Sequence, residues 1–397
     1  MRILLSLAIG LTFIAAAPST PSVVAIGDIH GDLNAFDRSL RAAALTDQSG
    51  RWIGGRRVLV QTGDYLDRGP EVRGVLDRLM ALETEAAAAG GRVVALLGNH
   101  EVMNLVGELR DVNPVTFQAF ADERSEERRE AAWQKYQQLG SRLTVDARKE
   151  LYERHRDEWM HDHPPGYLEY REALSPRGRY GAWLRKRDVV TMVGDTIFMH
   201  AGLIASNPPR KLNDVNAGLR DEIRRFDQFV ERLVDDNLAL PSFTLKEVIE
   251  VAQQTMADAA EAVETARKQK RQLDRSAIDV DLVTAAADVL KINTWSALDP
   301  RGPLWYRGFS TLSERDSDDI VSLLQRYRAA RFVTAHTVTS DRRIDVRFGG
   351  RVILIDTGML ASVYNGRPSA VRIEGSSLSA IYEDQQQPLT GSPAVPR

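Results

Sequence analysis

Six side chains that commonly bind metal ions stand directly after apolar runs of the sequence. They comprise two carboxylates, three imidazoles and one amide: Asp28, Asp64, His30, His200, His336 and Asn99. If the apolar runs are buried strands, the residues that follow them meet at one edge of a sheet. Such a donor set suits two metal ions that share one carboxylate, an arrangement that activates water and supports displacement at phosphorus.

Three neighbouring residues add functions that phosphoester cleavage requires. The guanidinium of Arg68 can contact two phosphate oxygens at once. The imidazole of His100, next to Asn99, can protonate a leaving oxygen, and the carboxylate of Asp67 can orient that imidazole. Singly, each residue has an ordinary explanation, such as a helix cap or a surface ion pair. Together after successive apolar runs, they predict a catalytic site.

The amino-acid composition excludes several kinds of active site. The chain of 397 residues contains no cysteine, which excludes disulfides, thiolate metal sites and a cysteine nucleophile. A Gly-x-Ser-x-Gly motif is also absent from the sequence. Oxygen and imidazole ligands favour manganese, iron or zinc. The formal net charge of −3 gives no indication of nucleic-acid binding.

The pattern of apolar residues predicts how the candidate ligands are positioned. Strands are expected at 22–26, 58–61 and 92–97, with helices at 34–45 and 70–89 between them. This alternation predicts a parallel βαβαβ unit and an α/β fold. Later strands are expected in a list of short apolar runs: 189–193, 196–199, 332–335, 344–348, 352–356, 371–373 and 378–382.

Two long charged stretches interrupt this pattern, at about 104–178 and 214–290. Their spacing predicts helical insertions with solvated faces. The first contains His155, His161 and His163, which could form a second metal site. Exposed loop histidines are the preferred interpretation of these three residues.

We expect residues 18–383 to form the folded domain, and the two ends of the chain differ from it in composition. Residues 1–17 have the basic start, apolar run and small residues of a cleaved secretory signal. We therefore expect a periplasmic or secreted protein whose mature form has no stable membrane span. If the signal stays uncleaved, the protein would be tethered to the membrane. The tail 384–397, rich in Gln, Pro and Ser, is predicted to be disordered.

Three motifs resemble the signature of the calcineurin-like metallophosphoesterases: Gly-Asp-Ile-His-Gly at 27–31, Gly-Asp-Tyr-Leu-Asp-Arg-Gly at 63–69 and Gly-Asn-His-Glu at 98–101. The Asp-Arg-Gly ending and the Glu after Asn-His are similar to the phosphoprotein phosphatase family. Residues 200–203, 335–337 and 302–307 also resemble the bacterial Shewanella-like phosphatases.

This resemblance implies a sandwich of central β-sheets flanked by helices, and hydrolysis of phosphomonoesters by a hydroxide that bridges two metals. The substrate would be a protein or peptide phosphorylated on tyrosine, serine or threonine. The resemblance implies that one metal is bound by Asp28, His30 and Asp64, and the other by Asp64, Asn99, His200 and His336. It also implies that Arg68 and Arg307 bind the phosphate. His100 would donate the proton, supported by Asp67.

The sequence also departs from this pattern. Asp-Thr-Gly at 356–358 replaces the Ser-Ala-Pro-Asn-Tyr loop of eukaryotic relatives, so the preferred phosphorylated residue stays open. Arg307 could simply stack on an aromatic ring. Trp305 and Tyr306 could stack on a base, which would suit a nucleotide or dinucleoside polyphosphate substrate. The alternative to an enzyme is a non-catalytic binding module that is stabilised by metal.

Overall fold

The first part of the chain forms the βαβαβ unit that the sequence predicts. The computed structural model describes residues 22–141, 154–272 and 278–390. The elements of this unit are β1 (Val23–Ile26), α1 (Leu33–Ala42), β2 (Val58–Gln61), α2 (Val72–Ala88) and β3 (Arg92–Ala95). Both strand pairs are parallel, and Val23 lies opposite Val58 in the register. The three strands therefore end at the same edge of the sheet.

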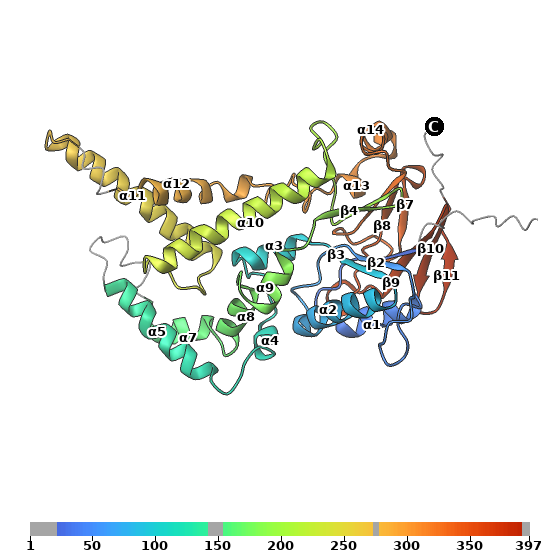
Figure 1. The fold of residues 1–397 in the computed structure, drawn as a ribbon, viewed down its shortest axis with the longest axis horizontal. Helices are drawn as coiled ribbons and strands as arrows, with labels where there is room; N and C mark the ends of the chain where they lie inside the picture. The colour runs from blue at the N-terminus through green and yellow to red at the C-terminus, as the bar shows by residue number, and fades with distance from the viewer. Residues whose placement is uncertain (1–21, 142–153, 273–277, 391–397) are drawn as a thin grey trace, which may run out of the picture.

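Two sheets lie in the right-hand part of the molecule in Figure 1. The six-stranded sheet has the order β11-β10-β9-β1-β2-β3, and the five-stranded sheet has the order β4-β5-β6-β8-β7. The added strands are β4 (Val190–Val193), β5 (Thr196–Met199), β6 (Arg331–Thr334), β7 (Asp345–Arg347), β8 (Val352–Leu354), β9 (Ser369–Glu374), β10 (Ser377–Tyr382) and β11 (Gln386–Pro388). The predicted sandwich of sheets flanked by helices is confirmed.

Apolar residues on both faces of the central strands hold these layers together. Ala25 and Val60 of the first sheet belong to the same buried cluster as Phe198 and Val333 of the second. Ile26 instead belongs to the larger cluster that includes the buried faces of α1 and α2. Strands that are buried on both faces have continuous apolar sequences, which is why these runs stand out in the chain.

Helices occupy most of the described residues of the two charged stretches. The first contains α4 (Pro114–Gln118), α5 (Ser125–Ser141), α7 (Arg156–Asp162) and α8 (Tyr167–Leu174). It follows directly from α3 (Asn99–Val106) and is followed by α9 (Arg179–Leu184). The second contains α10 (Leu212–Asp235), α11 (Leu245–Lys268) and α12 (Val280–Val289). The helices of both stretches extend to one side of the sheets in Figure 1. α5, α7, α10, α11 and α12 share a buried cluster that includes Trp133, Trp159 and Phe229, whereas α4, α8 and α9 pack into the larger cluster of the sandwich.

The histidines of the first insertion differ from expectation at one position. His155 and His161 are exposed, but His163 is buried and its ring stacks on Trp159 at a centroid distance of 3.9 Å. The Nδ1 atom of His163 lies 2.8 Å from the carbonyl oxygen of Trp159. His163 is thus part of the packing of the insertion. Among the described residues, the groups that could hold a metal do not include it.

Short helices complete the second half of the sandwich. They are η2 (Ile292–Thr294), α13 (Gly308–Thr311), η3 (Glu314–Asp316), α14 (Ser317–Tyr327), η4 (Phe348–Gly350) and α15 (Ala361–Tyr364). Ser313 and Asp316 form a capping box at the start of η3, just before α14. No helix within the described ranges combines the length and apolar character needed to cross a membrane.

The described part of the tail is ordered, which corrects the prediction of disorder from Asp384. Residues Gln386–Pro388 form β11 and pair antiparallel with β10 at the edge of the six-stranded sheet. Leu389 also donates its backbone N–H to Leu378 at 2.9 Å. Backbone pairing needs no apolar pattern, so a polar composition did not reveal this strand. The predicted signal at 1–17 and the last residues, 391–397, lie outside the described ranges.

Candidate active site

The six candidate ligands lie in the connections that follow five strands, at one edge of the sandwich. Asp28 and His30 follow β1, Asp64 follows β2, and Asn99 follows β3 as the first residue of α3. His200 follows β5 and His336 follows β6. All six are buried. The prediction that strand ends bring these residues together is therefore met by the geometry.

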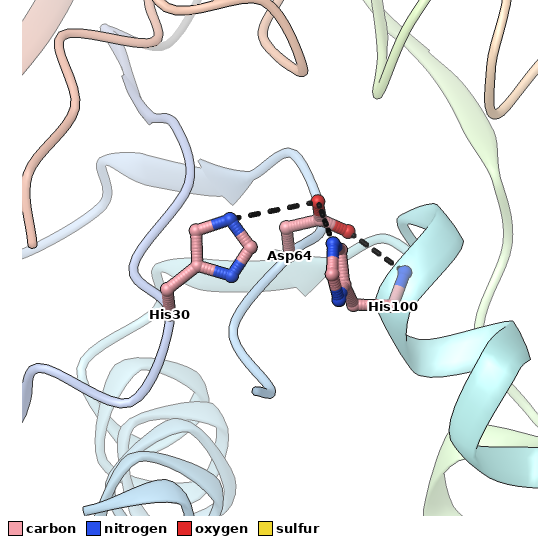
Figure 2. Close-up of side chains that lie close together, drawn as sticks. All are labelled: His30, Asp64 and His100. Carbon is pink, nitrogen blue, oxygen red and sulfur yellow. Dashed lines mark hydrogen bonds and ion pairs between the residues drawn. The ribbon is translucent and has the colours of Figure 1, made fainter. Parts of the chain in front are cut away.

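Asp64 is at the centre of a first group with two imidazoles (Figure 2). The Oδ2 atom of Asp64 lies 3.8 Å from Nε2 of His30 and 3.8 Å from Nε2 of His100. Asp28 approaches the same histidine, with 4.0 Å between its Oδ2 atom and Nε2 of His30. Ligand atoms of Asp64, His30 and His100 are thus close enough to surround one ion.

The same carboxylate belongs to a second group on its other side. Oδ2 of Asp64 lies 3.3 Å from Nε2 of His200. That nitrogen is 2.9 Å from Oδ1 of Asn99 and 3.0 Å from Nδ1 of His336. Asp64 is therefore the residue that the two groups share, the position that a bridging ligand requires.

Backbone carbonyls fix the imidazoles of both groups. Nδ1 of His30 lies 3.0 Å from the carbonyl oxygen of Leu66, and Nδ1 of His200 lies 3.1 Å from that of Thr62. In each case Nδ1 must carry the hydrogen, because a carbonyl only accepts. In each ring the lone pair is then on Nε2, the nitrogen that approaches Asp64, and a backbone contact at Nδ1 of this kind is usual for a histidine ligand.

Burial and neighbouring charges together shift the pKa values of these groups. Burial lowers the pKa of His30 to about 3 and that of His336 to about 2, so both are neutral near pH 7. Burial opposes the charge on Asp64, but the imidazoles of His200 and His100 outweigh it and hold the pKa of Asp64 well below its usual value. Nε2 of His336 is buried without a hydrogen-bond partner among the described residues. The residues present thus fit a two-metal centre.

Glu101 shapes the loop that carries Asp64. Its two carboxylate oxygens accept backbone N–H groups from Asp64, Tyr65, Leu66 and Gly98 at 2.7–3.0 Å. The close approach also requires glycine at position 98, since a Cβ there would lie 2.1 Å from Oδ1 of Asp64. His100, at the start of α3, donates its backbone N–H to that same Oδ1 atom at 3.1 Å.

His100 and Asp67 form a buried pair beside the two groups. Nδ1 of His100 lies 2.7 Å from Oδ2 of Asp67. Burial alone would lower the pKa of His100, but the carboxylates of Asp64 and Asp67 raise it above its usual value. A protonated His100 therefore carries an N–H at Nε2, on the side of Asp64, where it can act as a proton donor.

The two candidate phosphate-binding arginines lie at different depths. Arg68 is partly buried, and its Nη1 atom donates to Nε2 of His30 at 2.8 Å and to the hydroxyl of Tyr364. Arg307 is exposed and donates to the carbonyl oxygen of His336 at 2.9 Å and to Thr337 Oγ1 at 2.8 Å. Arg307 is thus fixed by hydrogen bonds at the rim of the site.

Two residues that contact the site were not assigned to it from the sequence. Asp356 follows β8, lies buried and hydrogen-bonds Asp28; together with burial it raises the pKa of Asp28 well above its usual value. Asp356 ends the strand predicted at 352–356, and this place at a strand end was the signal that could have found it. Tyr364 gave no such signal, because it contacts Arg68 from the short helix α15.

Comparison with known proteins agrees with this geometry. Residues 21–340 match the family described as Calcineurin-like phosphoesterase. The chain is 34% identical over 217 residues to Shewanella-like protein phosphatase 2 of Arabidopsis thaliana, covering 51% of this chain and 52% of that protein. It is 27% identical over 222 residues to Shewanella-like protein phosphatase 1 of Plasmodium berghei, covering 54% and 50%. The chain thus spans about half the length of these curated relatives.

The fold also has a solved counterpart. The crystal structure of a cold-active protein-tyrosine phosphatase from a psychrophilic Shewanella species aligns with a TM-score of 0.57 at 21% identity, covering 93% of this chain and 80% of that chain. At this identity the likeness concerns the fold. Since the family match covers most of the residues, this chain belongs to the calcineurin-like phosphoesterase family.

Proposed function

We propose that this chain is a metal-dependent phosphoprotein phosphatase that hydrolyses phosphomonoesters. The observation that carries the proposal is the position of Asp64 between His30 on one side and His200 and His336 on the other, next to the hydrogen-bonded pair of His100 and Asp67. Holding metal alone does not require such a pair or the neighbouring Arg68. Their presence argues against a binding module that uses metal only for stability.

Two metal ions, when bound, supply Lewis acidity that activates water and stabilises charge on the phosphoryl oxygens. The proposed ligands of one ion are Asp28, His30 and Asp64, and those of the other are Asp64, Asn99, His200 and His336. Oxygen and imidazole donors favour manganese, iron or zinc among biological metals.

The remaining site residues bind the phosphate and deliver a proton. Arg68 neutralises charge on the phosphoryl oxygens, and Arg307 at the rim contacts the phosphate or the segment next to it. Water attacks phosphorus and the bond to the leaving oxygen breaks. His100 then transfers its Nε2 proton to that oxygen, while Asp67 stabilises the imidazolium form before transfer.

Two observations favour a phosphoprotein over a nucleotide as substrate. The curated relatives are named as protein phosphatases. The indole N–H of Trp305 donates to the carbonyl oxygen of Ala297 at 3.0 Å, and its ring meets His336 edge-on at 6.0 Å. Trp305 is therefore held in the loop and poorly placed to stack on a base. We further propose export to the periplasm or beyond, which N-terminal sequencing of the mature protein would test.

The experiment that tests the proposed function uses the variant Asp64→Asn. It should lose metal-dependent hydrolysis of p-nitrophenyl phosphate and of phosphopeptides, because the shared carboxylate is removed from both groups. A decrease in bound metal, measured by mass spectrometry, should accompany the loss. Full activity with normal metal content would refute the two-metal proposal. Faster turnover of dinucleoside polyphosphates than of any phosphopeptide by the unaltered protein would refute the substrate class.

A further inference from the structure

A chain of buried hydrogen bonds connects the first helical insertion to His100. Oδ1 of Asp67 accepts from Nδ2 of Asn104 at 2.8 Å, while Oδ2 of Asp67 binds Nδ1 of His100 at 2.7 Å. The hydroxyl of Tyr170 then donates to Oδ1 of Asn104 at 2.5 Å. The four side chains form one line from α8 through α3 to the loop after β2.

The donors and acceptors in this line leave little freedom of orientation. The amide nitrogen of Asn104 donates to Asp67 and, at 2.9 Å, to the carbonyl oxygen of His100. Its amide oxygen is left to accept, and the hydroxyl of Tyr170 is the donor that meets it. A flipped amide would place an oxygen against the Asp67 carboxylate. The hydroxyl of Tyr170 therefore favours the amide orientation in which Asn104 donates to Oδ1 of Asp67, while Oδ2 of Asp67 binds His100.

Packing holds Tyr170 in this position. Its side chain is fully buried, and its ring meets Phe117 and Phe120 edge-on at centroid distances of 5.4 and 5.0 Å. The next residue, Arg171, donates to the backbone oxygen of Asn104 at 3.0 Å. The helix α8 is thus attached to α3 at the residue that supports Asp67.

We propose that Tyr170 and Asn104 are positioning residues for the proton donor His100, and that the first helical insertion contributes to catalysis through them. The inference rests on the proposed phosphatase function. Removal of the Tyr170 hydroxyl allows the Asn104 amide to turn and weakens the hold of Asp67 on His100. Proton delivery to the leaving oxygen then becomes less effective, whereas binding of metal and phosphate stays unchanged.

The variant Tyr170→Phe, with Tyr167→Phe as its control, tests this inference. Tyr167 lies one turn earlier on α8, is also buried and contacts Phe117, but its hydroxyl donates to the carbonyl oxygen of Ser242 at 3.2 Å. For a phosphoserine peptide, whose alkoxide is a poor leaving group, Tyr170→Phe should lower kcat about tenfold, part of the roughly 10²–10⁴-fold that a general acid supplies. For p-nitrophenyl phosphate kcat should fall less than about twofold, with KM and metal content unchanged.

Equal losses on the two substrates, or the same selective loss in Tyr167→Phe, would overturn the inference. In a His100→Asn background, Tyr170→Phe should have no further effect on kcat. An additive loss of kcat would contradict the proposal that Tyr170 acts through His100. If Tyr170→Phe folds poorly, Asn104→Leu in the same two backgrounds gives the same comparison. Failure of the proposed function is distinguishable, because the unaltered protein would then hydrolyse neither substrate.

Discussion

At the scale of single residues, the candidate site combines strained backbone with fixed side chains. Five of its residues are non-glycine residues with positive φ, between +48° and +66°: His30, Asp64, Asp67, Arg68 and His336. Such conformations cost about 1–3 kcal/mol each and persist where surrounding contacts hold them, often at functional sites. Glu101 supplies such contacts by accepting the backbone N–H groups of Asp64 and its two successors.

The variant His100→Asn tests the proposal that Asn99 binds metal while its neighbour His100 donates the proton. The asparagine side chain can still hydrogen-bond Asp67 but cannot donate a proton to the leaving oxygen. We expect kcat for a phosphoserine peptide to fall about 10²-fold or more, whereas p-nitrophenyl phosphate loses far less because its leaving group needs no proton. Steady-state kinetics on both substrates, with metal content as the control, measures the difference. A similar loss on both would remove His100 from the role of proton donor.

At the scale of elements, the strands were the most predictable part of the chain. The apolar run 58–61 coincides with β2, the helix expected at 34–45 overlaps α1 over residues 34–42, and the helix expected at 70–89 contains α2. Strand ends also located the candidate ligands, because parallel strands in one sheet finish at the same edge. The support from Tyr170 was not predictable, since it depends on packing of α8 against a residue 66 positions earlier.

The first helical insertion should contribute to acid sensitivity through His163. Burial between the rings of Trp159 and Tyr167 lowers the pKa of His163 to about 4, against about 6.5 in an unfolded chain. Between these values the unfolded state binds the extra proton, so the free energy of unfolding falls as the pH drops from about 6.5 to about 4. The lost stability amounts to about 3 kcal/mol for this residue.

The variant His163→Phe keeps an aromatic ring at this position and removes the titrating group. We expect the decline in unfolding free energy between pH 6.5 and pH 4 to be about 3 kcal/mol smaller in this variant than in the unaltered protein, measured by urea denaturation. His161→Gln is the matched control, since His161 lies on α7, two residues before His163, and is exposed. An unchanged pH dependence in His163→Phe would contradict the assignment.

At the scale of the whole molecule, the candidate ligands come from both layers of the sandwich. Asp28, His30, Asp64 and Asn99 follow strands of the six-stranded sheet, whereas His200 and His336 follow strands of the five-stranded sheet. The group of Asp64, His200 and His336 therefore spans the two sheets. Metal bound there would connect the two layers, in addition to the apolar contacts between them.

Removal of metal should consequently lower the stability of the whole fold. A ligand that binds the folded state alone adds about 2.7 kcal/mol at a free concentration of one hundred times its Kd. We expect chelation to lower Tm by about 5 °C or more, and Mn²⁺ to restore it. Calorimetry with and without chelator measures the shift. Asp64→Asn, which affects both groups, should show a smaller response to Mn²⁺, while His155→Gln, at an exposed histidine outside the site, should respond fully. Equal responses in the two variants would mean that metal acts elsewhere, because the Asp64 carboxylate is common to both proposed sites.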